Sequence, residues 1–286
     1  MSPTAEVTST PVRIKDILVA TDFGKCSEAA MVYAITLARH YSSRLHVIHV
    51  FDPALDNESR GQVERRAAEL DRSRQLAEMS HCVSVETGDV IEVLTRRAQQ
   101  TGVDLVVVGT HGRHGISKLV AGSVSEQLFR HASVPVLTIG PLVSIGGAVD
   151  FHRVVHPTDF SSASQIALPY AVSIAEEYGS ELFLLHAIIP SEVPWEDPTR
   201  EAVSRCEDRL AALVPASALV HVKPQCVAEY GLAAETIVNV ARQRKAGLIV
   251  MGVHSKGIIA ASTHFPWPVA HNVVCDAPCP VLTIRD

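Results

Sequence analysis

The chain alternates short apolar runs, rich in β-branched residues, with longer stretches in which apolar residues recur at every third or fourth position. The short runs are almost continuously apolar, as expected of parallel strands that are covered on both faces. The longer stretches have the spacing of amphipathic helices. In the first half, strands are predicted at Asp16–Thr21, Arg44–Phe51, Cys82–Thr87, Val103–Gly109 and Val134–Ile139, and helices near Ser27–Tyr41, Glu58–Met79, Val90–Gln100 and Val124–His131.

The second half repeats this order of elements. Its strands are predicted at Val154–Thr158, Glu181–Ile188, Val220–Ala228, Gly247–Gly252 and Pro280–Ile284. Strands that alternate with helices predict an α/β fold, because each crossover between parallel strands needs a helix and is right-handed. The pattern therefore predicts two tandem, doubly wound, five-stranded parallel sheets.

The duplication is also visible in the letters of the sequence. Residues 16–23 (DILVATDF) reappear as residues 153–160 (RVVHPTDF), and residues 136–139 (VLTI) reappear unchanged as residues 281–284. A length of 286 residues suits two domains, since one domain takes about 150 residues. The predicted domains are residues 12–141 and 151–286, with a disordered tail at residues 1–11 and a glycine-rich linker at 142–150.

Composition narrows the class of protein. With 47% hydrophobic and 20% charged residues, the chain reads as an ordinary globular protein. The net charge of −6 argues against nucleic-acid binding, and no apolar run approaches the roughly 18 residues of a membrane span. The start of the chain lacks the apolar stretch of a signal peptide, so a cytoplasmic location is predicted.

The cysteines give no indication of a metal site. The six cysteines show no CxxC spacing, and no second pair or histidine cluster joins Cys275 and Cys279. The pattern predicts buried free thiols in a reducing compartment, and no metal ligand.

Candidate chemistry follows the fourth predicted strand of the first half. That strand runs into Gly109 and Gly112, and then into Gly122-Ser123 ahead of a helix. Glycines allow the backbone to approach a ligand closely, and Ser123 with Glu126 forms a capping box at the helix start. The unpaired N–H groups of a helix start bind anions, and the hydroxyl of Ser125 would add a donor. The structural alternative is that these glycines serve only turns and helix–sheet packing.

The loop matches neither a Walker A loop nor the dinucleotide motif G-x-G-x-x-G. Instead, Gly109, Gly112, Gly122 and Ser123 form G-x2-G-x9-G-[ST], which resembles the motif of ATP-binding universal stress proteins. The TDF sequence with Asp22, the strand ending in His49-Val50 and the sequence H-A-x-x-P-V-L at residues 131–137 also resemble that family. The resemblance covers both halves of the chain.

The resemblance implies a strand order of 3-2-1-4-5 and a nucleotide pocket at the carboxyl ends of strands one and four, where open α/β sheets bind ligands. The ligand would be ATP or a related adenine nucleotide, with Mg²⁺ accompanying ATP. Asp22 has an alternative role, which is to cap the helix that follows it. The implied site has an adenine and ribose end formed by Ala20, Thr21, Asp22 and Val50, a wall formed by Val108 and Gly109, and a phosphate end formed by Gly112, Gly122, Ser123, Val124 and Ser125.

The second half keeps the fold pattern but not the loop. Counting back from the shared VLTI, Trp267 stands where Gly122 does, and Pro268 stands where Ser123 does. Tryptophan would fill the space, and proline removes a donor, although proline suits the first turn of a helix. Gly112 corresponds to Ser255, and Gly247 replaces Asp104. The second site is therefore predicted to be degenerate; the alternative is a pocket rebuilt for another ligand by Thr263, His264 and Trp267.

The sequence favours a nucleotide-binding stress-response or signalling module with an unnamed protein partner. No nucleophile with a neighbouring base stands out, and only His111 and His114 could serve as acid or base near the phosphates, so ATP hydrolysis would be slow at most. The alternatives are a nucleotide-free interaction scaffold and, less favoured, an adenylyl-transferring enzyme, whose HxGH and SGGxDS signatures are absent. By the resemblance, the last strands of the two halves (Val134–Ile139 and Pro280–Ile284) would pair in an internal pseudo-dimer, and a homodimer is a further candidate assembly.

Overall fold

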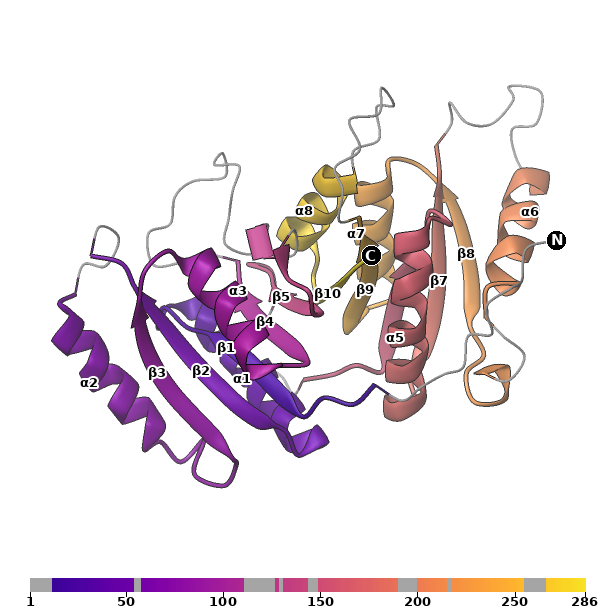
Figure 1. Cartoon of the computed structure of the whole chain (residues 1–286). Coiled ribbons are helices and arrows are strands. Elements are labelled where there is room, and N and C mark those ends of the chain that lie inside the picture. Colours follow the sequence, from indigo (N-terminus) through magenta and orange to yellow (C-terminus); the bar gives the residue numbers. More distant parts are fainter. Residues whose placement is uncertain are drawn as a thin grey trace. The chain divides into compact units, whose positions relative to one another are not determined.

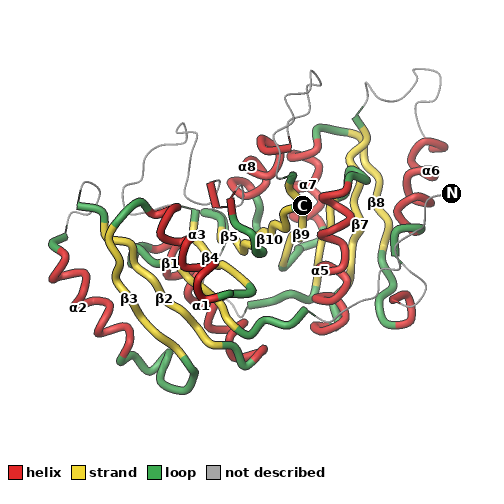
Figure 2. Tube along the Cα trace, in the orientation of Figure 1, coloured by secondary structure: helices red, strands yellow, loops and turns green. Residues whose placement is uncertain are grey.

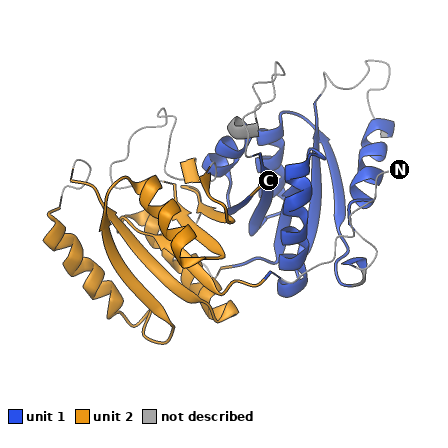
Figure 3. Ribbon diagram, viewed as in Figure 1, with its two compact units in different colours: residues 1–12, 150–284, 286 blue, residues 13–149, 285 orange. Residues whose placement is uncertain are grey.

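The computed structural model describes residues 12–53, 58–110, 127–128, 131–143, 149–189, 200–214, 218–254 and 266–286. The chain forms two compact units, which contain residues 13–149 and residues 150–284 (Figure 3). Each unit combines parallel strands with helices, as the sequence pattern predicts (Figures 1 and 2). Among the described helices, none combines the length and the apolar character needed to cross a membrane.

The strands of the first unit are ordered β3-β2-β1-β4-β5, the order that the family resemblance implies. All the pairs are parallel. Because the order reverses at β1, this strand lies between β2 and β4, and its three middle residues are buried. The strands are β1 (Asp16–Ala20), β2 (Arg44–Phe51), β3 (His81–Thr87), β4 (Leu105–Gly109) and β5 (Val136–Ile139).

Three helices of the first unit are described: α1 (Lys25–Tyr41), α2 (Arg60–Asp71) and α3 (Val90–Thr101). In Figure 1, α3 crosses in front of the strands of its unit. The ends of α3 follow ordinary capping rules. Asp89 accepts a hydrogen bond from the Glu92 amide at the start, and Gly102 adopts a left-handed conformation with φ = 62° at the end. Of the predicted helix at 124–131, Gln127, Leu128 and His131 are helical, and the remaining residues lie outside the described ranges.

The prediction of a long helix at Glu58–Met79 is wrong in its second half. Helix α2 ends at Asp71, and residues 72–79 form turns although their composition favours a helix. Leu76 is fully buried in these turns, and the His81 ring lies 3.1 Å from the carbonyl oxygen of Asp71. Arg39 of α1 donates to the carbonyl of Gln75 at 3.2 Å. Contacts with the rest of the unit thus override the local helix propensity.

The second unit has the strand order β10-β9-β6-β7-β8, which is the same topology. Helix α5 crosses in front of its strands in Figure 1. The elements are β6 (Arg153–Pro157), α5 (Ser162–Tyr178), β7 (Glu181–Ile188), α6 (Arg200–Ala211), the 3₁₀ turn η2 (Ala218–Val220), β8 (Gln225–Tyr230), α7 (Ala233–Gln243), β9 (Leu248–Val253), α8 (Pro266–Asp276) and β10 (Val281–Arg285).

Two further predictions need correction. The strand predicted at Val220–Ala228 begins only at Gln225, directly after Pro224, because proline cannot donate a hydrogen bond to a neighbouring strand. The cysteines are free, as predicted, but only Cys279 is buried, and the other five are half-buried. The domain limits and the internal pseudo-dimer remain predictions.

Candidate functional site

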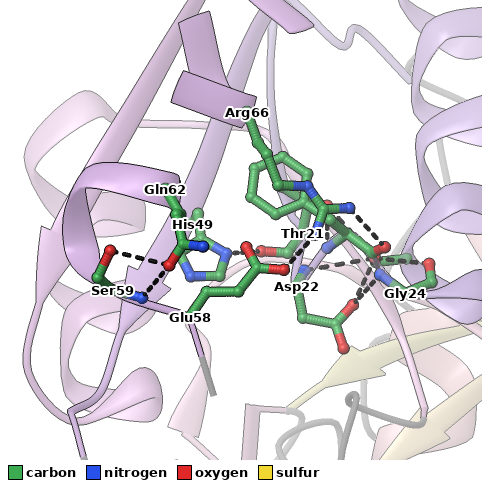
Figure 4. Close-up of polar contacts among 10 residues, drawn as sticks. Thr21, Asp22, Gly24, His49, Glu58, Ser59, Gln62 and Arg66 are labelled. Carbon is green, nitrogen blue, oxygen red and sulfur yellow. Dashed lines mark hydrogen bonds and ion pairs between the residues drawn. The ribbon is translucent and has the colours of Figure 1, made fainter. Parts of the chain in front are cut away.

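The candidate site begins at the carboxyl end of β1, where the chain makes a tight turn into α1. The Thr21 amide donates to the carbonyl of Ile48 at 2.9 Å, which continues the pairing with β2. The Thr21 side chain is buried, and its hydroxyl oxygen accepts a hydrogen bond from the Phe23 amide at 2.9 Å. The His49 ring nitrogen Nδ1 lies 2.8 Å from the Thr21 carbonyl oxygen. Figure 4 shows Thr21 and His49 at this turn.

Asp22 uses its two carboxylate oxygens differently. Oδ1 accepts hydrogen bonds from the Gly24 amide at 2.9 Å and from the Ser27 hydroxyl at 2.5 Å. These bonds fix the start of α1, so the capping role that we considered for Asp22 is present, although the N-cap residue itself is Gly24. Oδ2 is buried and has no hydrogen-bond partner among the described residues. Oδ1 therefore stabilises the start of α1, and Oδ2 can accept a further hydrogen bond.

A stack of side chains covers the other side of the turn. Phe23 adopts a left-handed φ of 57°, which costs a bulky residue on the order of 1–3 kcal/mol. Its ring stacks on the His49 ring with centroids 5.1 Å apart, and the Arg66 guanidinium lies 4.6 Å from the Phe23 centroid. Arg66 also forms an ion pair with Glu58 at 3.0 Å, as Figure 4 shows. The stack holds the strained turn in place.

The second unit repeats this turn and stack. The Phe160 amide donates to the Thr158 hydroxyl at 3.0 Å, and the His186 ring lies 2.8 Å from the Thr158 carbonyl. Phe160 has φ = 62°, packs on His186 with centroids 4.7 Å apart and lies 3.9 Å from the Arg209 guanidinium. The sequence analysis missed Arg66 and Arg209, although Thr-Asp-Phe and the later histidine recur in both halves and indicate a shared structure here.

The aspartate of the second turn is in a different environment. Asp159 is exposed, and its Oδ1 accepts hydrogen bonds from the Ser161 amide and hydroxyl at 3.0 and 2.5 Å. Partial desolvation favours the neutral form of this carboxyl, but the hydrogen bonds from Ser161 and Ser164 outweigh it and lower its pKa. Unlike Asp22, which is half-buried, Asp159 is exposed, so water can reach its carboxylate.

The carboxyl end of β4 forms the second part of the candidate site. Strands β1 and β4 are neighbours, with Val19 opposite Val107, so the ends of the two strands lie side by side. Ala20 and Val50 pack against a buried apolar cluster that includes Val108. Leu128, which follows the glycine loop, belongs to the same cluster. The structure therefore brings together the predicted apolar residues of the site.

Gly109 has a packing role that the sequence analysis treated only as an alternative. A Cβ at this position would lie 2.6 Å from the backbone carbon and oxygen of Cys26, in the first turn of α1. The packing is even tighter at Gly252, where a Cβ would lie 2.1 Å from the carbonyl oxygen of Ala163. The first glycine of the motif is thus needed in both units for close helix–strand packing.

The rest of the predicted phosphate end lies outside the described residues, namely Gly112, Gly122, Ser123, Val124 and Ser125. The same holds for Thr263 and His264 of the alternative pocket. In the second unit, α8 begins at Pro266, so Trp267 and Pro268 lie in its first turn, where proline was expected to be tolerated.

The exchange of Asp104 for Gly247 belongs to the opposite end of the strands. Oδ2 of Asp104 accepts hydrogen bonds from the amides of Lys15 and Asp16 at 2.6 and 3.1 Å, at the start of β1. A Cβ at Gly247 would lie 1.9 Å from the carbonyl oxygen of Asp150. This difference is structural and does not bear on the candidate ligand site.

The strand order, with β1 and β4 side by side where it reverses, defines an open α/β protein. Proteins of this class bind ligands at the carboxyl ends of the strands at such a topological switch point. The universal stress protein family matches residues 13–140 and again residues 150–285. The chain belongs to the universal stress protein family and carries two of its domains in tandem.

Individual relatives agree with this assignment. A universal stress protein of Mycolicibacterium smegmatis is 25% identical over 297 residues, covering 94% of this chain and 96% of its own. One from Methanocaldococcus jannaschii is 29% identical over 146 residues, covering 47% of this chain and 82% of its own. The solved structure of a universal stress protein from Archaeoglobus fulgidus superposes with a TM-score of 0.69 at 20% identity, covering 94% of this chain and 96% of its own.

Proposed function

We propose that the first unit binds ATP or a related adenine nucleotide at the carboxyl ends of β1 and β4. The supporting observation is Oδ2 of Asp22, which is buried and has no partner among the described residues. Leaving a buried acceptor unpaired costs about 1–3 kcal/mol. A ligand that donates an N–H or O–H to this oxygen would remove that cost, and both the adenine amino group and the ribose hydroxyls are such donors.

The apolar residues beside Asp22 suit the base. Ala20 and Val50 are only partly buried, and both pack against the cluster around Val108. A flat, weakly polar ring placed on these side chains would bury apolar surface while its polar edge reaches Asp22 and the Thr21 backbone. The same side chains offer no recognition of a phosphate.

The phosphates would extend from Gly109 into the glycine loop. This part of the proposal rests on the motif formed by Gly112, Gly122 and Ser123, with Val124 and Ser125 at the start of the following helix. Amide groups at a helix start bind phosphate oxygens without a basic side chain. Mg²⁺ would be carried by the triphosphate.

We further propose that the protein acts as a stress-response or signalling module in the cytoplasm. Nucleotide occupancy of the first unit would change its affinity for a protein partner, and ATP hydrolysis would be slow at most. The second unit would not bind nucleotide, because Asp159 is exposed and because Trp267 and Pro268 stand where Gly122 and Ser123 stand in the first half. We expect the last strands of the two units to pair in an internal pseudo-dimer, and two chains to associate as a homodimer.

A pair of matched substitutions tests the role of Asp22. In Asp22→Asn, the amide can keep its oxygen toward Gly24 and Ser27, so α1 keeps its start, while an NH₂ group replaces Oδ2. We expect the affinity for ATP and AMP, measured by calorimetry, to fall by about tenfold or more, since a hydrogen bond to a charged group contributes about 1.5–3 kcal/mol. Asp159→Asn is the control and should leave the affinity unchanged.

The nucleotide that copurifies with the protein is the second measurement. Denaturing the purified protein and quantifying released nucleotide should give close to one adenine nucleotide per chain. No released nucleotide, together with no heat of binding for ATP or AMP, would instead favour the nucleotide-free scaffold. An equal loss of affinity in the Asp22 and Asp159 variants would contradict the proposal that only the turn around Asp22 binds nucleotide.

A further inference from the structure

Three polar side chains form a row across the starts of the first three strands of the first unit. Asp16 opens β1, and His46 and Cys82 lie directly opposite each other on β2 and β3. Because side chains alternate along a strand, and because His46 is opposite Leu18, two residues after Asp16, all three point to the same face of the sheet. The row lies at the end of the strands opposite to Asp22 and Gly109.

The three side chains are joined by the imidazole ring. Nε2 of His46 lies 2.7 Å from Oδ1 of Asp16, and Nδ1 lies 3.3 Å from Sγ of Cys82. When Nε2 carries the proton and donates it to the carboxylate, the lone pair of Nδ1 faces the thiol. Asp16 thus fixes both the ring orientation and the tautomer in which His46 can accept the thiol proton.

The exposure of the three groups suits a reactive thiol. The His46 side chain is 13% exposed, and the Asp16 side chain is 33% exposed. Cys82 is half-buried, so the residue is partly exposed to solvent. Catalytic and redox-active cysteines are found in such partly exposed positions beside a base, whereas buried thiols are inert.

We propose that Cys82 is a modification site that reacts with small-molecule disulfides, with His46 as its base and Asp16 as the residue that positions His46. The thiol proton passes to Nδ1 of His46, and the sulfur of Cys82 attacks one sulfur of the disulfide. The S–S bond of the reagent breaks, and the leaving thiolate takes the proton back from the imidazolium. One thiol and one disulfide thus give a mixed disulfide on Cys82 and one free thiol, without a further oxidant.

The second unit shows that the fold does not require the row. By strand register, Arg153, Phe183 and Gln225 stand where Asp16, His46 and Cys82 stand in the first unit. There, Arg153 pairs with Glu181 at 3.0 Å, and Gln225 donates to the same carboxylate at 3.3 Å. A different set of polar contacts thus occupies the corresponding part of the second unit's strands.

The second unit also supplies a matched control thiol. Cys226 lies on β8, the strand that corresponds to β3, and is half-buried like Cys82. Burial raises the pKa of the Cys226 thiol, and the nearby charge of Glu207 raises it further. At neutral pH, Cys226 is therefore a poor nucleophile at comparable exposure.

The test follows the reaction of the full-length protein with an aromatic disulfide, 5,5′-dithiobis(2-nitrobenzoic acid), at neutral pH. Peptide mapping by mass spectrometry gives the rate at each cysteine. We expect Cys82 to react at least about tenfold faster than Cys226, as for a thiol activated by a neighbouring base. Cys82→Ser should remove the fast reaction and leave the remaining cysteines unchanged.

Variants of the row distinguish a chemical role from a structural one. His46→Gln, which keeps a polar side chain but no base, should slow the modification of Cys82 by about tenfold. His46→Ala should be slow as well, and added imidazole should restore its rate, which a merely structural role would not allow. Asp16→Asn should slow Cys82 less than His46→Gln does.

The comparison of Cys82 with Cys226 in the unaltered protein decides the proposal even if a variant fails to fold. Equal rates at the two cysteines would overturn it. An unchanged Cys82 rate in a folded His46→Gln protein would also overturn it, because the thiol would then react without the base. Neither result depends on whether the first unit binds nucleotide.

Discussion

The two units build the same turn after their first strand but differ in what that turn leaves open. Both hold a phenylalanine in a left-handed conformation beneath an arginine and beside a histidine, and both depend on a glycine at the end of the fourth strand. They differ in the aspartate between threonine and phenylalanine. Asp22 keeps a buried oxygen without a partner among the described residues, whereas Asp159 is exposed. The features that the two units share are therefore those that the fold requires. The feature in which they differ, the environment of the aspartate, points to function.

The largest expected effect is on ATP affinity, when the glycine loop of the first unit receives the residue that stands at the same position in the second unit. Gly122→Trp copies Trp267 into the proposed phosphate site. We expect at least a 1000-fold loss of ATP affinity by calorimetry, or about 4 kcal/mol, because the indole occupies the space of the phosphates. The circular dichroism spectrum should be unchanged, since the second unit carries tryptophan at this position. Retained affinity in a folded variant would mean that the phosphates lie elsewhere.

A buried histidine gives the second unit an acid sensitivity that the first unit lacks at the same position. His156 of β6 stands where Val19 stands in β1, is fully buried, and has its Nδ1 2.9 Å from the Val250 carbonyl oxygen. Burial lowers the pKa of His156 from 6.5 to about 4, although the Val250 carbonyl and the Asp159 charge act in the opposite direction. The folded unit therefore keeps this ring neutral over a pH range in which the unfolded chain takes up a proton.

The sign of the pH dependence follows from that difference. Above pH 6.5 the ring is neutral in both states, and stability is not affected. As the pH falls from there toward about 4, the unfolded state binds the proton first, so the free energy of unfolding should decrease by about 3 kcal/mol. His156→Val, which copies the first unit, should remove this part of the acid dependence.

Tryptophan fluorescence can follow this effect in one unit alone, because both tryptophans, Trp195 and Trp267, belong to the second half of the sequence. Urea unfolding at neutral pH and near pH 4.5 gives the two free energies for each protein. If the unaltered protein and His156→Val lose the same stability on acidification, His156 does not carry the acid sensitivity.

The glycines near the carboxyl ends of β4 and β9, Gly109 and Gly252, give the smallest expected effect when they are replaced. A methyl group at Gly109 or Gly252 would press on the first turn of α1 or α5 at 2.6 or 2.1 Å, respectively. We expect Gly109→Ala to lower the free energy of unfolding by about 2 kcal/mol and Gly252→Ala by somewhat more. Thermal unfolding measures both losses. Gly61→Ala is the control, because nothing lies within 4 Å of its Cβ and alanine favours the helix. Equal losses in all three variants would contradict the packing role.

The sequence predicts the fold well where the pattern of one segment is enough to define an element. The almost continuously apolar runs locate β1, β4 and β9 closely, since most residues of these strands are buried. It fails at residues 72–79, where buried Leu76 and the contact between Arg39 and Gln75 end a helix that local propensity would continue. Those contacts join residues far apart in the chain, and no periodicity within a segment reveals them.

For the candidate site, the sequence predicts which apolar residues gather at the strand ends, but not how the two oxygens of Asp22 are used. Ala20, Val50 and Val108 gather as expected, because adjacent parallel strands end at one edge. That Oδ1 and Oδ2 of Asp22 have different environments depends on the position of Ser27, which the sequence does not specify. The row of Asp16, His46 and Cys82 was missed because its members stand far apart in the chain, although each falls at or near the start of a predicted strand.

The different environments of Oδ1 and Oδ2 in Asp22 have a consequence for how such proteins evolve. A mutation at this position would weaken the start of α1 as well as any ligand contact, so selection for a stable fold is enough to retain the aspartate. If the second unit binds no nucleotide, as we propose, its Thr-Asp-Phe turn has been kept without that activity. In this chain, both halves share the turn, and the loop after the fourth strand is where their sequences differ.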